Sequence, residues 1–208
     1  MNKLYSNKNR QTGSALIIGL TILMVILIIG TAGMRTTIME EKMAGNVRDY
    51  NIAFQAAESA LKDGEVDILN VDPVTNEPIR PGVFPADDDF STDCNVGDSQ
   101  RNGLCLPSTT LQPQWLTIDW TAPTNKPYRQ YGQYTKIDGG DTPTLPSVSE
   151  QPRYIIEFLG SGGGSLAIGG VPRPVNKYYR VTAQGYGIAT TDTLEPLARV
   201  MLQSTYGK

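Results

Sequence analysis

The first third of the chain contains one long apolar segment. From residue 14 to residue 34 the sequence reads SALIIGLTILMVILIIGTAGM, and none of these 21 residues is charged. At a rise of 1.5 Å per residue, a helix of this length spans about 30 Å, the thickness of the hydrocarbon core of a bilayer. Because the segment is apolar on every side, it predicts a membrane helix rather than a helix in a soluble core.

The pattern after residue 34 is amphipathic but still helical. Apolar side chains recur there at spacings of four and three residues, which places them on one face of a helix. We call these residues the apolar stripe: Met43, Val47, Tyr50, Phe54, Ala57 and Leu61. We predict that a single helix continues through residues 35–63, that Gly64 ends it, and that the apolar stripe packs against a globular head.

Alternation of apolar and polar positions predicts strands in the C-terminal half. Such runs, rich in β-branched and aromatic side chains, occupy residues 115–120, 153–159, 178–186 and 197–206. Consecutive strands joined by turns form an antiparallel meander. The predicted fold class is therefore α+β, with a long N-terminal helix packed on an antiparallel β-sheet head.

Proline and glycine positions place the start of the head. All 14 prolines lie at Pro73 or later, and 15 of the 21 glycines lie beyond Gly64. Since proline interrupts helices and both residues favour turns, residues 64–208 form the head. Four prolines within residues 72–90 predict a loop that crosses its surface.

Composition excludes several classes of function. The 18 basic and 21 acidic residues give a formal charge of −3, which argues against a nucleic-acid partner. The chain has no histidine, so imidazole-based catalysis and imidazole metal sites are excluded. Two cysteines are too few for a four-cysteine zinc site. We therefore expect no enzyme activity, no cofactor and no metal.

One acidic run leaves a calcium site open. Asp87, Asp88, Asp89 and Asp93 are typical of a solvated loop. Clustered carboxylates also suit a hard cation, although the spacing of an EF-hand is absent.

The two cysteines predict a disulfide. Cys94 and Cys105 enclose the polar segment NVGDSQRNGL, and closing such a loop removes about 3 kcal/mol of entropy from the unfolded chain. A disulfide places residues beyond 34 in an oxidising compartment. Charge alone leaves orientation undecided, because three basic residues precede the apolar segment and three follow it before residue 50.

The N-terminal third carries a family resemblance. Gly13 and Ser14, between a basic leader and the apolar helix, resemble the cleavage site of a class III prepilin signal. The segment MRTTIMEEKMAGNVRDYNIAFQAAESAL, from Met34 to Leu61, is similar to the segment that marks PilX-type minor pilins of the type IV pilus. The C-terminal YYRVTAQGYG and RVMLQSTYG are similar to the last strands of that family.

This resemblance implies a pilin-like fold and a processing route. Residues 1–13 would be a cytoplasmic leader cut after Gly13 by prepilin peptidase, and residues 14–34 would form the transmembrane and filament-core half of the helix. The head would face the periplasm while the protein is a single-pass inner-membrane protein, and would later lie on the pilus fibre at the cell surface. The implied partners are the major pilin, other minor pilins, the inner-membrane assembly platform and a large tip adhesin.

One position departs from the pattern of major pilins. The fifth residue after the cleavage site, usually Glu in pilins, is Ile18. In the resembled family this carboxylate meets the N-terminal amine of a neighbouring subunit, because an unpaired charge among apolar helices is costly. A subunit without it fits the filament tip, where no subunit lies above.

Three functions remain open from the sequence. The first is a minor pilin that initiates and caps pilus assembly, in support of adhesion, twitching motility or aggregation. The second is a tip pseudopilin of type II secretion. The third is a membrane-anchored periplasmic protein whose head binds a ligand or partner and which never enters a filament.

Overall fold

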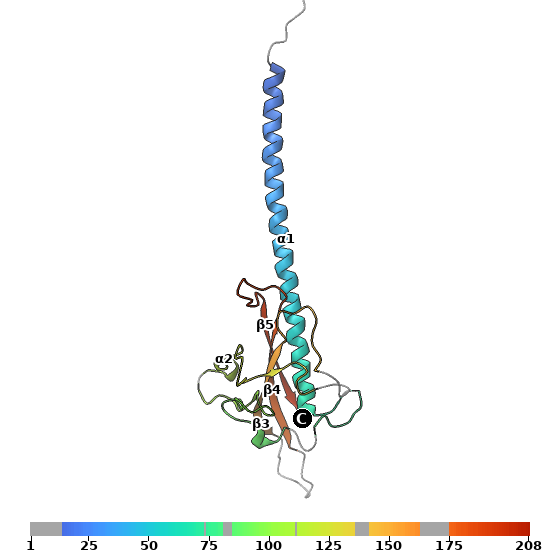
Figure 1. The fold of residues 1–208 in the computed structure, drawn as a ribbon, viewed down its shortest axis with the longest axis vertical. Coiled ribbons are helices and arrows are strands. Elements are labelled where there is room, and N and C mark those ends of the chain that lie inside the picture. The colour runs from blue at the N-terminus through green and yellow to red at the C-terminus, as the bar shows by residue number, and fades with distance from the viewer. Residues whose placement is uncertain (1–13, 73, 81–84, 111, 136–141, 163–174) are drawn as a thin grey trace, which may run out of the picture. The chain divides into compact units, whose positions relative to one another are not determined.

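The computed structural model describes residues 14–208 except 73, 81–84, 111, 136–141 and 163–174. The predicted leader, including Gly13, lies outside the described residues. The chain divides into two compact units, Met1–Asn46 and Val47–Lys208, which we describe separately. Helix α1 (Ser14–Leu69, 56 residues) contributes to both units (Figure 1).

The second unit contains a mixed five-stranded sheet. Its long strands β3 (Arg153–Gly162), β4 (Asn176–Tyr186) and β5 (Arg199–Gly207) are antiparallel neighbours, which confirms three of the four predicted strands. Two short strands were not predicted, β1 (Leu104–Cys105) and β2 (Arg129–Gln130). Both pair with β3, and β1 runs parallel to it. The predicted α+β architecture is confirmed, but the sheet is mixed rather than purely antiparallel.

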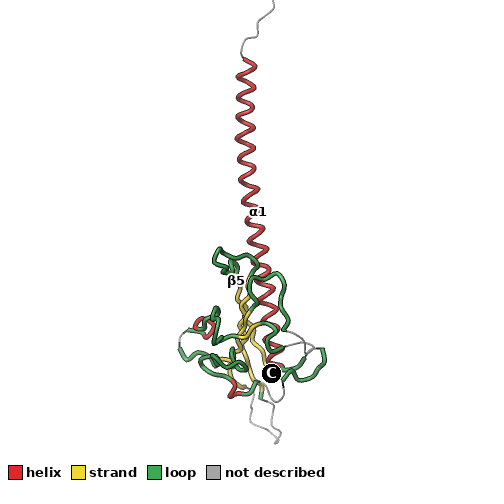
Figure 2. Tube along the Cα trace, in the orientation of Figure 1, coloured by secondary structure: helices red, strands yellow, loops and turns green. Residues whose placement is uncertain are grey.

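The C-terminal part of α1 covers one face of this sheet (Figure 2). Tyr179, Val181 and Ala183 of β4 share that face, as their alternation predicts, and form a core with Ala60 and Ile68 of α1. On β5, Val200 and Leu202 pack against α1 in a second cluster. The opposite face of β3 carries Ile155, which packs with the disulfide and with aromatic side chains from loops.

The apolar stripe is not the buried face of α1, so this prediction is wrong for most of its members. Met43, Val47, Tyr50 and Phe54 are exposed at 68, 59, 54 and 41 %. Only Ala57 is buried, and Leu61 is partly buried against the core. The residues that α1 buries between 53 and 60 are all alanines: Ala53, Ala56, Ala57 and Ala60.

The reason is the close approach of helix and sheet. A Cβ atom added to Gly185 of β4 would lie 2.2 Å from the carbonyl oxygen of Ala53 and 2.2 Å from the amide nitrogen of Ala57. The two backbones are therefore in contact, and only small side chains fit between them. The sequence pattern was traced through the largest apolar residues of the helix, whereas the close contact with β4 accommodates only the smallest ones.

The same approach explains why Gly64 does not end the helix. A Cβ at Gly64 would lie 2.6 Å from Cγ1 of Val181, so glycine is needed there for packing on β4. The helix continues to Leu69 and ends at Asn70, whose φ of 55° is the left-handed conformation that favours asparagine or glycine after a helix.

The segment 115–120 is also not a strand. Residues Gln114–Thr117 form the short helix α2, and Trp120 donates its indole N–H to the carbonyl oxygen of Trp115 at 2.9 Å. Trp115, Ile118 and Trp120 still pack together, against the disulfide cluster. A local turn, not a strand, brings these apolar side chains to one side.

Candidate functional site

The apolar segment of α1 is exposed along its whole described length. Large side chains from Leu16 to Met34 have exposed fractions between 54 and 75 %. The hydroxyls of Thr21 and Thr31 donate to the carbonyls of Ile18 and Ile28, at 2.8 and 3.1 Å, so the segment presents few free polar groups. An 18-residue window of α1 has a mean hydropathy of 2.8, which makes it the one candidate membrane span among the described residues.

This segment carries the two N-terminal positions singled out in the sequence that the structure describes. Ser14 is the first residue of α1, and Ile18 is 54 % exposed. A surface that is almost entirely aliphatic offers no charge and few hydrogen bonds to a partner. Such a surface can pack against lipid chains or against other apolar helices, which fits a membrane anchor and association with a pilus.

The predicted disulfide is present. Cys94 and Cys105 are joined, and both are fully buried. Cys105 belongs to β1, which pairs with β3, so the bridge attaches the loop to the edge of the sheet. The side-chain amide of Asn95 donates to the carbonyls of Asp89 and Leu104, at 2.7 and 3.0 Å, and fixes the start of the loop.

Three aspartates of the acidic run beside this loop interact with different side chains. Asp87 pairs with Lys177 at 2.6 Å, and Asp89 pairs with Arg101 at 3.1 Å. Asp93 accepts a hydrogen bond from the hydroxyl of Ser91. Among the described residues no group of three or more metal-binding side chains exists.

A buried ion cluster lies at the C-terminal end of α1. The carboxylate of Asp67 accepts from Nη1 of Arg129 at 2.5 Å and from the hydroxyl of Tyr154 at 3.1 Å, and it also pairs with Arg80. The side chains of Asp67 and Arg129 are completely buried. Two guanidinium groups therefore share one carboxylate in the interior of the head.

Arg129 extends the cluster to the disulfide loop. Its Nε donates to the carbonyl of Asn102 at 2.8 Å, and its Nη2 donates to the carbonyl of Gln100 at 3.1 Å. The ring of Tyr134 lies 4.1 Å from Cζ of Arg129 and 5.3 Å from Cζ of Arg80. The cluster thus joins the helix end, the disulfide loop and the strands β2 and β3.

Burial dominates the electrostatics of the cluster. Burial, together with the positive charge of Arg129, lowers the pKa of Arg80 to about 10. Burial also raises the pKa of Asp63, one turn before Asp67, while hydrogen bonds from the hydroxyl of Thr135 and the amide of Gly132 oppose the shift. No alternation or heptad pattern indicated these residues. Their one sequence signal is that Asp63 and Asp67 are four residues apart on a helix whose first 21 residues are uncharged.

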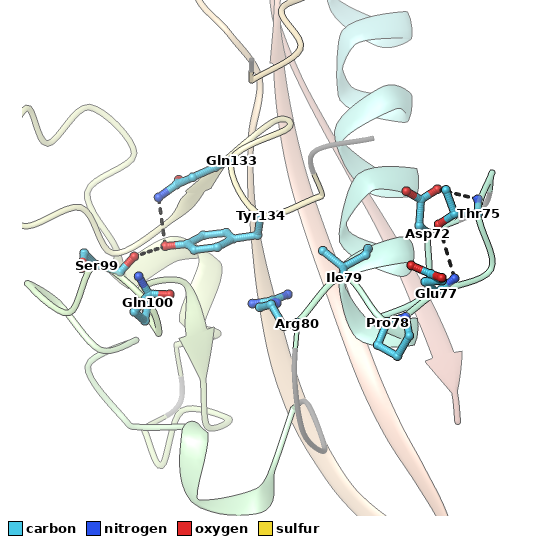
Figure 3. A pocket seen from close by; sticks show the side chains of 10 residues that line it. All are labelled: Asp72, Thr75, Glu77, Pro78, Ile79, Arg80, Ser99, Gln100, Gln133 and Tyr134. Carbon is cyan, nitrogen blue, oxygen red and sulfur yellow. Dashed lines mark hydrogen bonds between the residues drawn. The ribbon is translucent and has the colours of Figure 1, made fainter. Parts of the chain in front are cut away.

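A hollow of the described surface lies beside Arg80 (Figure 3). It has a volume of about 780 Å³. Arg80 and Tyr134 lie near its centre, between Ser99 and Gln100 on one side and Asp72 and Glu77 on the other. The hydroxyl of Tyr134 donates to the carbonyl of Ser99 at 2.5 Å. Arg80 and Tyr134 thus connect the lining of this hollow to the ion cluster.

A second carboxylate fixes the end of β4 to α1. Asp49 is 6 % exposed, and its Oδ1 accepts from the amides of Ile188 and Ala189 at 2.6 and 2.9 Å. A Cβ at Gly187 would lie 2.4 Å from that oxygen. Gly185 and Gly187, both in the motif YYRVTAQGYG, therefore allow this end of β4 to approach α1 closely.

Two family models match these features. The PilX N-terminal model matches residues 12–62, and the model for the C-terminal part of the type IV pilus assembly protein PilX matches residues 97–208. The chain belongs to the PilX family of type IV pilus assembly proteins. No curated protein and no solved structure matches it significantly.

The two matches leave a segment of this PilX-family protein between them that carries several interactions of the head. The first covers the exposed apolar segment and the alanine face of α1, and the second covers the sheet and most of the disulfide loop. Residues 63–96 lie between them. That interval contributes Asp67, Arg80 and Cys94, and the Asp67–Arg129 ion pair and the disulfide join it to the second matched part.

Proposed function

We propose that this protein is a minor pilin that helps to initiate and cap type IV pilus assembly near the filament tip. Membership of the PilX family makes it a pilus assembly protein. The observation that carries the finer assignment is Ile18, an aliphatic residue in an apolar surface where pilins usually have a carboxylate.

The physical argument concerns charge pairing between subunits. In a filament the mature N-termini lie among apolar helices, where an unpaired charged group costs several kcal/mol. A shaft subunit with Ile18 would leave the amine of a neighbour unmatched. A tip subunit has neighbours only below it, so the missing carboxylate has no amine to meet and costs nothing.

The proposal includes a processing step. Prepilin peptidase would cut between Gly13 and Ser14 on the cytoplasmic side and leave 208 − 13 = 195 residues. The head would then face the periplasm, consistent with a disulfide between Cys94 and Cys105. The partners would be the major pilin, other minor pilins, the assembly platform and a large tip adhesin.

The test is a deletion strain examined by electron microscopy. We expect the number of pili per cell to fall far more than their length, because initiation is lost while elongation needs only the major pilin. Immunogold labelling of the complemented strain should mark one end of each pilus. Label spread along the shaft, or a normal number of pili in the deletion strain, would contradict the tip assignment.

Two further measurements separate processing from placement. An intact mass that still includes residues 1–13 in a peptidase-competent cell would favour a membrane-anchored protein that never enters a filament. Ile18→Glu should leave processing intact and should fail to raise the number of pili. Ile18→Leu, which keeps an aliphatic side chain, is the matched control and should behave as wild type.

A further inference from the structure

A pocket beside the disulfide shares no lining residue with the hollow of Figure 3. It lies between the start of the disulfide loop, residues 92–96, and the segment 114–127, and its volume is about 360 Å³. This volume accepts a single amino-acid side chain or a molecule of similar size. The pocket is separate from the apolar part of α1 and from the ion cluster around Asp67.

The walls of the pocket are partly apolar. Val96, Ile118, Ala122 and Pro127 line it. Ile118 and Ala122 also pack against the buried cluster that contains the disulfide, so a rigid part of the head supports them. An aliphatic chain of a few methylene groups can be desolvated against such walls.

A buried carboxamide supplies a hydrogen-bond acceptor. Gln114 lines the pocket and is 6 % exposed. Its Nε2 donates to the carbonyl of Thr92 at 2.9 Å and contacts Sγ of Cys94 at 3.3 Å, which fixes the orientation of the carboxamide. In the described part of the chain no donor is bonded to its Oε1. This oxygen is not among the buried side-chain atoms that lack a partner, so it is open to solvent and can accept a hydrogen bond from a ligand.

Two carboxylates complete the lining. Asp93 accepts from the hydroxyl of Ser91, and Asp119 accepts from the hydroxyl of Thr121 at 2.7 Å. These hydrogen bonds lower the pKa of both carboxyl groups, so both are ionised at neutral pH. The pocket therefore combines apolar walls with acceptors and negative charge.

We propose that this pocket binds a lysine or arginine side chain of a partner protein. The apolar walls contact the methylene groups of that side chain, and its cationic end donates to Asp93, Asp119 and the Oε1 of Gln114. Charge complementarity selects this occupant over an acidic or an aliphatic side chain. The inference rests on the pocket alone and holds whether or not the protein sits at a pilus tip.

The test is carbodiimide cross-linking of the full-length protein in detergent to a short peptide. The probe has one central lysine, glycine and serine elsewhere, and blocked termini, so its one amine can form an amide only with a carboxylate that it contacts. Methylamine, which lacks the aliphatic stem, is coupled in parallel to correct for the reactivity of each carboxylate. Mass spectrometry then assigns the modified residues.

We expect corrected coupling of the peptide at Asp93 and Asp119 to exceed that at Asp88 and Asp192 at least fivefold, because the latter are exposed carboxylates outside the pocket. Ala122→Phe fills the pocket without changing its charge and should remove this preference. A urea-unfolding midpoint of that variant close to the midpoint of the wild type shows that the head is folded. Equal corrected coupling at all four residues, or a preference that survives Ala122→Phe, would overturn the proposal.

Discussion

In two parts of helix α1, the size of the apolar side chains and their burial are related in opposite ways to what is usual in a globular protein: the large side chains are exposed and the small ones are buried. Between residues 16 and 29 the helix consists largely of leucine and isoleucine, and these side chains are at least half exposed. Between residues 53 and 68 the buried positions are alanine, glycine, aspartate and a single isoleucine. Apolar size therefore does not predict burial within this chain. Large apolar side chains occur where no described part of the chain covers the helix, and small ones occur where the helix contacts the backbone of the protein's own sheet.

The largest effect is expected at Asp67, near the C-terminal end of the buried part of α1. Asp67→Ala removes the carboxylate that Arg129 and Arg80 share, and leaves two guanidinium groups together in a buried cluster. We expect the free energy of unfolding to fall by about 3–5 kcal/mol. Urea unfolding of the full chain in detergent, followed by the fluorescence of Trp115 and Trp120, measures the change.

The control for this experiment is an exposed ion pair. Glu195 and Arg199 pair at 2.7 Å, and their side chains are 61 and 38 % exposed. Glu195→Ala should change the free energy of unfolding by less than about 1 kcal/mol. Equal losses for the two variants would show that Asp67 is not the structural centre of the head.

The second test makes the same substitution at a buried and at an exposed position of the helix. Ile68 is fully buried and Ile38 is 53 % exposed, and both belong to α1. Ile68→Ala should lower the free energy of unfolding by about 2–5 kcal/mol, because it opens a cavity in the core. Ile38→Ala should change it by at most about 0.5 kcal/mol. A similar loss at Ile38 would mean that the exposed part of the helix has a partner within the chain.

The third test adds a methyl group instead of removing one. In Gly185→Ala the new Cβ meets helix backbone at 2.2 Å, so we expect destabilisation by about 1–3 kcal/mol, or more if β4 cannot shift. Gly45→Ala is the matched variant, since nothing lies within 4 Å of a Cβ at that position. It should stabilise the helix by up to about 1 kcal/mol. Thermal unfolding followed by circular dichroism distinguishes the two signs.

The smallest expected effect depends on pH. Burial raises the pKa of Asp63 above its ordinary value, so the folded state favours the protonated form. The folded head therefore loses stability as the pH rises from the unfolded-state pKa to the folded-state pKa. Asp63→Asn, which stays neutral, should gain stability relative to wild type on going from pH 4 to pH 7. A difference between the two proteins that is constant with pH would contradict the assigned ionisation.

The sequence predicts the parts of this fold in which one residue pattern has one physical cause. The apolar segment and the alternation in β3, β4 and β5 are of this kind, because the residues on one side of each element face one environment. The disulfide was predictable because only two cysteines exist and both lie in one polar loop. The strands β1 and β2 have two residues each, which is too short for any periodicity.

The buried face of α1 and the ion cluster were not predictable from local pattern. Alanines at 53, 56, 57 and 60 favour a helix anywhere, and only the proximity of Gly185 reveals why they are buried. Asp67 meets Arg129 across 62 residues of sequence and Tyr154 across 87. Such pairs arise from the topology of the sheet, which a single sequence does not specify.

The contacts of Asp67 also bear on mechanics. A force on the last turns of α1 would reach Arg129 and Tyr154 through the carboxylate of Asp67, in addition to the packing of α1 on the sheet. From Arg129 it continues to the carbonyls of Gln100 and Asn102, inside the loop that the disulfide closes. Extension of the head therefore has to break several interactions at once. We therefore expect the head to resist tension as a unit and not to unravel one strand at a time.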